Sequence, residues 1–189
     1  MKFLTKIFLD LSMKINYPCD TPDLDLRLRL PKNNLKKIRV LNVGVGSGLS
    51  GLAFQLYFLK FKQLDNIDVH LPYLEVAKKR FWRTKKVNFV NLDIRDKQVF
   101  DYDVVLMFDV LEHLPKEDSL KIIDKIKCRQ IIFIPLEKHF RKNTFGAESQ
   151  DHLSIWTEND FKERGYKTEV LPRFHREDDE FFDALWAIK

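Results

Sequence analysis

The segment Val40-Leu-Asn-Val-Gly-Val-Gly-Ser-Gly48-Leu-Ser-Gly51 decides the fold of this 189-residue chain. An apolar run leads into glycines at positions 44, 46 and 48, and a helical pattern follows. Glycine at these positions lets the backbone turn sharply and lets a ligand approach without a β-carbon in the way. The segment therefore predicts a strand, a tight turn that can hold a ligand, and a helix.

Short apolar runs alternate with helical stretches from residue 38 onward. Strands that alternate with helices form a parallel sheet covered on both faces. We therefore predict an α/β fold. Its strands are expected at 38–43, 67–69, 87–90, 104–108 and 131–134, and its helices at about 50–63, 72–82 and 115–126.

The C-terminal part of the chain has a different pattern. Thr157 followed by acidic residues is typical of a helix start, and Gly165 is typical of a helix end. Two strand-like runs follow at 167–171 and 182–188, joined by the charged stretch 173–180. This pattern predicts that the sheet ends in a hairpin.

The N-terminal part, residues 1–37, is expected to form a cap or linker before a domain that spans 38–189. Residues 3–15 place apolar side chains at helical spacing, which predicts an amphipathic helix packed on the domain. Residues 24–30 alternate leucine with charged residues, which is typical of a half-exposed strand.

Composition excludes several classes of protein. The chain is 44% hydrophobic and 32% charged with a net charge of +5, so it can bury a core and does not require a nucleic-acid partner. Cys19 and Cys128 lie far apart with no paired Cys/His spacing, which predicts neither a disulfide framework nor a metal site. Lys6, Asp10 and Lys14 interrupt the N-terminal apolar run, so we expect no signal peptide, no membrane span and a cytoplasmic location.

Polar side chains stand at or just after the ends of three consecutive predicted strands. Asp68 belongs to the second, Asp93 follows the third, and Asp109, Glu112 and His113 follow the fourth. Open α/β sheets bind ligands where the carboxyl ends of the strands meet, and a carboxylate about 20 residues after the glycine turn can accept both hydroxyls of a ribose. The sequence therefore predicts a crevice for a nucleoside-containing ligand.

With these motifs the chain resembles the class I S-adenosylmethionine (SAM)-dependent methyltransferases, especially the group with an Asp-x-Leu-Glu-His-Leu segment after the fourth strand. The resemblance extends over about residues 38–189. It implies a Rossmann-like, doubly wound, mostly parallel seven-stranded sheet with an antiparallel C-terminal strand. It rests on residues 40–51, 67–81, 89–96, 102–115 and 152–166.

The resemblance also implies which residues bind SAM and its product S-adenosylhomocysteine (SAH). The glycines would line the methionine part, Asp68 would hold the ribose hydroxyls, and Asp93 would face the adenine amino group. Asn42 stands where the family usually has Asp or Glu, and an amide keeps an acceptor but loses the charge that favours the cofactor's ammonium group. The implied set is Asn42, Gly44, Gly46, Gly48, Asp68, Val69, Asp93, Ile94, Phe108 and Asp109.

NAD is an alternative ligand, because dinucleotide sites share the Gly-x-Gly turn and the acidic residue. The dinucleotide fingerprint places its third glycine three residues after the second. That position holds Leu49 in this chain, and the third glycine comes one residue earlier. The segment 112–115 also has no role in the dinucleotide pattern. We therefore favour SAM.

His113 is the candidate catalytic base or acceptor contact, because it lies next to the crevice and a histidine usually titrates near neutral pH. The stretch 137–156 has no clear period, and loops of this length are usually functional or mobile. Its basic residues suit an anionic or sugar-phosphate acceptor. From this stretch we predict substrate contacts by His139, His152 and Trp156.

These features predict methyl transfer from SAM to a small-molecule or glycan acceptor. RNA is the alternative acceptor, and a non-catalytic SAM-binding interaction subunit is the alternative from another class. The Asn/Asp-Pro-Pro-Tyr/Phe motif of enzymes that methylate base amino groups is absent after the fourth strand, where Asp109-Val-Leu-Glu112 stands. The Pro18-Cys19 pair lies far from the position that cytosine C5 enzymes require.

Overall fold

The computed structural model describes residues 37–46, 61–80, 86–96, 101–140, 150–177 and 180–189. The predicted N-terminal helix, the strand at 24–30, most of the helix at 50–63 and Gly48 lie outside these residues.

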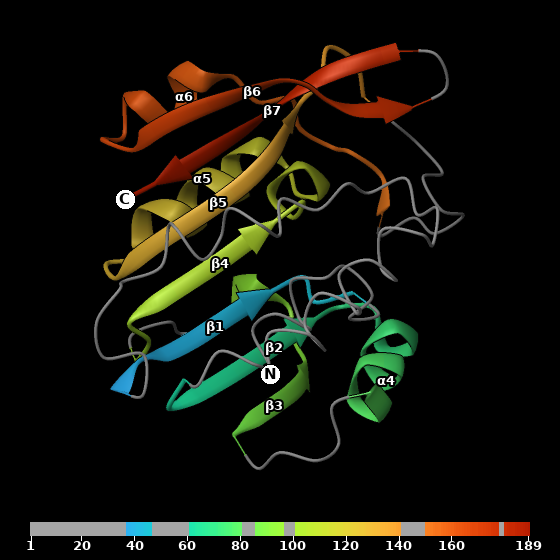
Figure 1. The fold of residues 1–189 in the computed structure, drawn as a ribbon, viewed down its shortest axis with the longest axis vertical. Coiled ribbons are helices and arrows are strands. Elements are labelled where there is room, and N and C mark those ends of the chain that lie inside the picture. Colours follow the sequence, from blue (N-terminus) through green and yellow to red (C-terminus); the bar gives the residue numbers. More distant parts are fainter. Residues whose placement is uncertain (1–36, 47–60, 81–85, 97–100, 141–149, 178–179) are drawn as a thin grey trace, which may run out of the picture.

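Seven strands form one sheet in the order β3-β2-β1-β4-β5-β7-β6 (Figure 1). The first five run parallel, and β7 pairs antiparallel with both β5 and β6. This arrangement confirms the predicted α/β, Rossmann-like sheet with an antiparallel C-terminal strand. The strands are β1 (Arg39–Val43), β2 (Gln63–Asp68), β3 (Val87–Asn91), β4 (Val104–Phe108), β5 (Arg129–Leu136), β6 (Lys167–Glu177) and β7 (Glu180–Ile188).

The described helices lie close to their predicted positions. The helix that connects β4 to β5 begins after Pro115 and has two acidic residues in its first turn. Their negative charges interact favourably with the positive end of the helix dipole. The helices are α4 (Leu71–Arg80), α5 (Lys116–Lys125) and α6 (Glu158–Lys162), with single 3-10 turns at η2 (Ile94–Asp96) and η3 (Leu111–His113).

Both faces of the sheet are buried. Along β1 and β4 successive side chains alternate between two apolar clusters, so that Leu41 and Val105 belong to one cluster while Val40 and Leu106 belong to the other. The first cluster continues into α5 and α6, and the second is filled by aromatic rings around Trp186. Near-continuous apolar strands buried on both sides are typical of parallel sheets.

The predicted start of β2 was wrong, because the strand begins at Gln63 where the sequence favoured a helix. Its interior carries Asp65 and Asn66, which are 8% and 1% exposed. Asp65 accepts hydrogen bonds from Gln63, Asn88 and Tyr102, and Asn66 accepts one from Asn42. When buried polar side chains form hydrogen bonds to other parts of the protein, the sequence of a buried strand has the polar pattern of a surface segment.

The charged stretch 173–180 was also misassigned, since much of it belongs to the long strands β6 and β7. The predicted hairpin itself is confirmed. Strand β6 lies at the edge of the sheet, where charged side chains remain hydrated. A register shift between Leu171 and His175 contains Arg173, whose φ is 53° and whose N–H donates to Asp183 Oδ1 at 2.8 Å.

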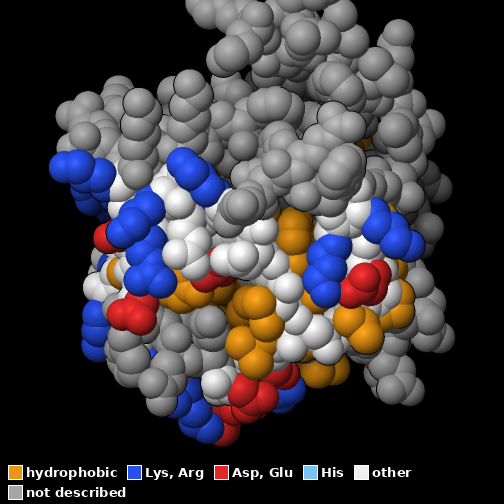
Figure 2. All heavy atoms as spheres, turned by 90° about the horizontal axis from the view of Figure 1, so that it is seen from below, with side chains coloured by type: hydrophobic (Ala, Val, Ile, Leu, Met, Phe, Trp, Pro, Cys, Tyr) orange, Lys and Arg blue, Asp and Glu red, His pale blue; other side chains and the backbone are white. Residues whose placement is uncertain are grey.

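At the opposite edge of the sheet, large apolar side chains remain exposed on β3 and α4, including Val90 at 42% and Leu71 at 48%. Figure 2 shows hydrophobic side chains in separate groups with Lys and Arg side chains between them. Within the described residues, no helix combines the length and the apolar character needed to cross a bilayer.

Thr157 caps α6, as predicted, and does so in a capping box with Asp160. Replacing Thr157 with alanine should lower the free energy of unfolding by about 1 kcal/mol, because an N-cap acceptor is lost. The expected fall in Tm is about 2–4 °C by calorimetry. Thr157→Ser is the matched control, since it keeps the hydroxyl. Equal melting of Thr157→Ala and the wild type would contradict the capping role.

Candidate active site

The carboxyl ends of β1, β2, β4 and β5 meet at one edge of the sheet (Figure 1). The glycine turn follows β1, and both described glycines adopt positive φ, 70° at Gly44 and 55° at Gly46. A β-carbon on Gly44 would stand 2.5 Å from Val110 Cγ2. Positive φ and this close contact explain why the first turn position requires glycine.

Asp68, at the end of β2, closes this turn. One carboxylate oxygen accepts from the N–H of Gly46 at 2.7 Å, and the other accepts from the N–H of His70 at 2.8 Å. Each carboxylate oxygen can accept more than one hydrogen bond, so the group retains capacity for a ligand's hydroxyls. The predicted closeness of the glycine turn and Asp68 is therefore present in the structure.

Asn42 contributes an unused acceptor to the same region. Its amide nitrogen donates to Asn66 Oδ1 at 3.0 Å, and the residue is 1% exposed. No donor among the described residues reaches Asn42 Oδ1. Because buried polar atoms are normally hydrogen-bonded, this oxygen suits a ligand that brings a donor, such as an ammonium group.

The third strand end is organised differently. Asp93 forms an ion pair with Arg95 at 2.6 Å, and hydrogen bonds from Arg95 hold the pKa of Asp93 below its usual value. Ile94 is 6% exposed and packs in the core, whereas Val69 is 53% exposed. Of the predicted adenosine contacts, Val69 is thus the most accessible.

Phe108 and Asp109 end β4. The ring of Phe108 packs edge-on against Trp186 in the core, so the residue can border a ligand chiefly through its backbone. Asp109 has a φ of 50°, and no described residue donates to its buried Oδ1. Its N–H donates to the carbonyl oxygen of Phe133 at 3.0 Å.

Beyond β4, titratable groups from three segments form one cluster, which we call the acidic-histidine cluster. His152 Nδ1 lies 2.5 Å from Glu137 Oε2, and its ring meets that of His113 edge-on at 4.8 Å. The carboxylate of Glu112 is buried next to both rings. The acidic-histidine cluster consists of Asp109, Glu112, His113, Glu137 and His152.

The backbone around η3 holds this cluster together. The carbonyl oxygen of Glu112 accepts from the N–H groups of Leu153 and Ser154 at 2.6 and 3.0 Å. The carbonyl oxygen of Leu111 accepts from the hydroxyls of Ser119 and Ser154. The segment around His152 is therefore clamped onto η3, which brings His152 to His113.

Burial shifts the pKa values of the cluster away from their usual range. It raises the pKa of Asp109 to about 7, with His152 opposing and Glu137 adding to the shift. It raises the pKa of Glu112 well above its usual value, with the charge of Asp109 adding to this. Burial, together with the nearby His152, lowers the pKa of His113 to about 4. Uncharged forms are thus favoured when no ligand compensates the charges.

Sequence analysis did not predict a metal site, but this cluster has the residue types for one. Glu112, His113 and His152 each offer a ligand atom, and these atoms lie within 4.8 Å of one another. Glu112 and His113 are distant from His152 in the sequence, so the spacing of these residues did not indicate a metal site. Glu137 was also missed, although its place after the apolar run of β5 matches the other polar strand ends.

The other two predicted substrate residues are not members of the cluster. The side chain of Trp156 is 2% exposed, stacks on Phe161 and lies under Lys116 Nζ at 3.9 Å from the ring centre. It therefore packs in the core and anchors the segment that carries His152. His139 is exposed after β5.

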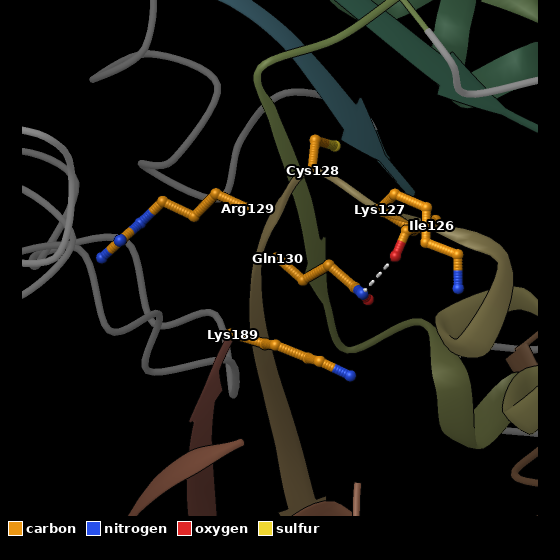
Figure 3. A pocket seen from close by; sticks show the side chains of 6 residues that line it. All are labelled: Ile126, Lys127, Cys128, Arg129, Gln130 and Lys189. Carbon is orange, nitrogen blue, oxygen red and sulfur yellow. Dashed lines mark hydrogen bonds between the residues drawn. The ribbon is translucent and has the colours of Figure 1, made fainter. Parts of the chain in front are cut away.

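A pocket of about 350 Å³ lies at the opposite end of the strands, where β5 begins (Figure 3). In this view the side chain of Gln130 points toward α5 and donates to the carbonyl oxygen of Ile126 at 3.1 Å. Because α/β sheets bind ligands at the carboxyl ends of their strands, we do not assign this pocket to the cofactor. Its lining residues are Ile126, Lys127, Cys128, Arg129, Gln130 and Lys189.

Comparison with known proteins identifies one family match within the chain. Residues 41–128 match the family described as a methyltransferase domain. No curated protein sequence matches the chain significantly.

Solved structures share the fold at low sequence identity. A SAM-dependent methyltransferase from Clostridium acetobutylicum is 14% identical with a TM-score of 0.65, over 98% of each chain. Magnesium protoporphyrin IX methyltransferase from Synechocystis with bound SAH is 18% identical with a TM-score of 0.61, over 88% of this chain and 80% of its own. The N-methyltransferase NodS from Bradyrhizobium japonicum in complex with SAH is 18% identical with a TM-score of 0.61, over 89% and 87%.

Because the pKa of Asp109 is raised, we expect Asp109→Asn to change how the free energy of unfolding depends on pH. The unfolded carboxyl ionises near pH 3.8 and the folded one near 7, so the wild type loses stability as pH rises through this window. The variant should match the wild type near pH 4 and exceed its free energy of unfolding by about 1–3 kcal/mol at pH 8. Urea unfolding in EDTA measures the difference.

Asp101→Asn is the matched control, because it removes one charge from an exposed turn. It should show no comparable gain at pH 8. A constant difference between Asp109→Asn and the wild type across this pH range would contradict the assigned burial of the Asp109 carboxyl.

Proposed function

We propose that this chain is a class I SAM-dependent methyltransferase and that it transfers the methyl group of SAM to a small-molecule or glycan acceptor held beyond the end of β4. The observation that carries the cofactor part is the contact between the glycine turn and Asp68, at 2.7 Å. It supports the proposal that the glycine turn and the Asp68 carboxylate border one crevice, to which we also assign the Asn42 oxygen that accepts no hydrogen bond from the described residues.

The described residues fit SAM at both of its polar ends. Asn42 Oδ1 can accept from the ammonium group, and Asp68 can accept from the ribose hydroxyls. Gly46 has open space at the position of a β-carbon, which leaves room for the methionine part. We assign Gly44 to the same part through its backbone, and Gly48 remains an expected contact outside the described residues. We assign the adenosine and sulfonium sides to Val69, Asp93, Ile94 and the backbone of Phe108 and Asp109.

Methyl transfer depends more on the alignment of the acceptor with the methyl group than on acid-base catalysis. When bound, SAM supplies an electrophilic methyl group on a sulfonium, and in-line displacement by a held acceptor gains most of its rate from alignment. A general base works best with a pKa near the working pH, whereas that of His113 is about 4. We therefore assign His113 to acceptor positioning rather than to proton abstraction.

The acidic-histidine cluster supports an acceptor that carries hydroxyl or amino groups. Carboxylates accept hydrogen bonds, and each imidazole can donate or accept one. Glycans and small polar molecules present such donors. His152 shares this role with His113, Trp156 supports it from the core, and His139 is proposed to contact the acceptor from the exposed side.

Cofactor binding can be tested with Asp68→Asn. SAH should raise the Tm of the wild type by several degrees, since a ligand at 100 times its Kd adds about 2.7 kcal/mol. In the variant, calorimetric titration should show a loss of about 1.5–3 kcal/mol in SAH binding, because a charged acceptor is removed. Asp101→Asn should bind SAH like the wild type. Full affinity in a folded Asp68→Asn protein would refute the crevice.

The acceptor class can be tested by incubating the protein with methyl-labelled SAM and cell extract. We expect label in small molecules or glycans, and markedly less with Asp68→Asn when SAM is below saturation. Label in RNA would replace the proposed acceptor. Binding of SAH without transfer to any fraction would instead identify a non-catalytic subunit.

A further inference from the structure

The carboxylate of Glu112 has no partner within the part of the chain that the structure describes. The residue is 1% exposed, and no described residue donates to either oxygen. Buried carboxylates are normally paired, hydrogen-bonded or bound to a metal. The ligand atoms of His113 and His152 lie within 4.8 Å of the Glu112 carboxylate and of each other.

Both histidines are oriented by contacts of their Nδ1 atoms. His113 Nδ1 lies 3.2 Å from the carbonyl oxygen of Asp151, and His152 Nδ1 lies 2.5 Å from Glu137 Oε2. A histidine that donates from Nδ1 presents the lone pair of Nε2. Metal-binding histidines almost always donate their other N–H to a carbonyl or carboxylate in this way.

We propose that Glu112, His113 and His152 bind a divalent transition-metal cation. Asp109 ends β4 nearby, and its buried Oδ1 also lacks a donor among the described residues, so it can add an oxygen directly or through water. Glu137 acts behind His152. The titratable groups that face the site are these three carboxyls and two imidazoles, so a divalent cation compensates the carboxylates.

The ligand types narrow the choice of cation. Imidazole nitrogens favour Zn²⁺, Fe²⁺ and their neighbours over Mg²⁺ and Ca²⁺, while carboxylates also suit Mn²⁺. Bonds of about 2.0–2.2 Å in a tetrahedral site place ligand atoms roughly 3.4 Å apart, so the side chains must close by about 1 Å or slightly more. The expected order of affinity is Zn²⁺ above Co²⁺ above Mn²⁺.

This site goes beyond methyl transfer, because its occupation requires neither SAM nor an acceptor. Where the proposed function holds, a cation bound here lies on the acceptor side of the crevice and can hold an acceptor oxygen. Ligation also occupies the His113 lone pair, which makes His113 a ligand and not a base.

The test uses the full chain after EDTA treatment and exhaustive dialysis. Titration with Co²⁺, followed by visible absorption, should give one equivalent with the spectrum of nitrogen and oxygen ligation. Calorimetry with Zn²⁺ should give one equivalent at higher affinity, and both cations should raise the Tm. Absence of saturable binding near one equivalent would overturn the proposal.

Variants distinguish this site from adventitious binding. Glu112→Gln and His152→Ala should each weaken Co²⁺ binding at least 10-fold. Asp101→Asn should leave Co²⁺ binding unchanged, because Asp101 is exposed and precedes β4, whereas the cluster lies after the carboxyl end of that strand. If Glu112→Gln does not fold, His152→Asn provides the same comparison. Wild-type Co²⁺ affinity in a folded cluster variant would refute these ligands.

SAH affinity, measured in EDTA, separates this proposal from the proposed function. SAH binding without Co²⁺ binding removes only the metal site. Co²⁺ binding without SAH binding removes only the cofactor assignment.

Discussion

Two backbone hydrogen bonds to the carbonyl oxygen of Glu112 hold the acidic-histidine cluster together. Leu153 and Ser154 donate them, and hydroxyl contacts to the carbonyl oxygen of Leu111 reinforce them. A short turn after β4 has few hydrogen-bond partners of its own, so another segment must satisfy its carbonyls. Because the segment around His152 does this, the same bonds that satisfy η3 also bring two imidazoles and a buried carboxylate together.

On the cofactor side, polar side chains inside the sheet have a comparable role. Asn42, Asn66 and Asp65 are buried in β1 and β2, and their hydrogen bonds cross to neighbouring strands. Hydrogen bonds between buried polar side chains favour one register, since a shift would break them and leave more buried groups unsatisfied. The register of β1 and β2 in turn places the glycine turn next to Asp68.

Local sequence signals predicted much of the fold. The apolar run of β4 matched its observed bounds, and the cap at Thr157 and the glycine turn were recognised from residues only a few positions apart. The start of β2 was missed because groups that satisfy Asp65 come from distant parts of the sequence, namely Asn88 in β3 and Tyr102 just before β4. Helical or strand periodicity indicates which apolar side chains are buried. It does not indicate which polar side chains form hydrogen bonds to residues distant in the sequence.

The candidate site was predictable only as a set of strand ends. Parallel topology alone places Asp68 and Asp109 at one edge of the sheet. The partnership of His113 with His152 and Glu137 depends on how a long connection folds back, which no local pattern encodes. For Trp156 the sequence predicted a substrate contact, but the side chain packs in the core.

The irregular edge strand β6 has a consequence for how the molecule meets its neighbours. A regular edge strand offers a continuous row of unpaired N–H and C=O groups to which another sheet can add. In β6 the register shift around Arg173 interrupts that row, and a left-handed residue within it bends the strand locally. The C-terminal hairpin therefore ends the sheet in a form that resists growth by strand addition, which protects the protein against edge-to-edge aggregation.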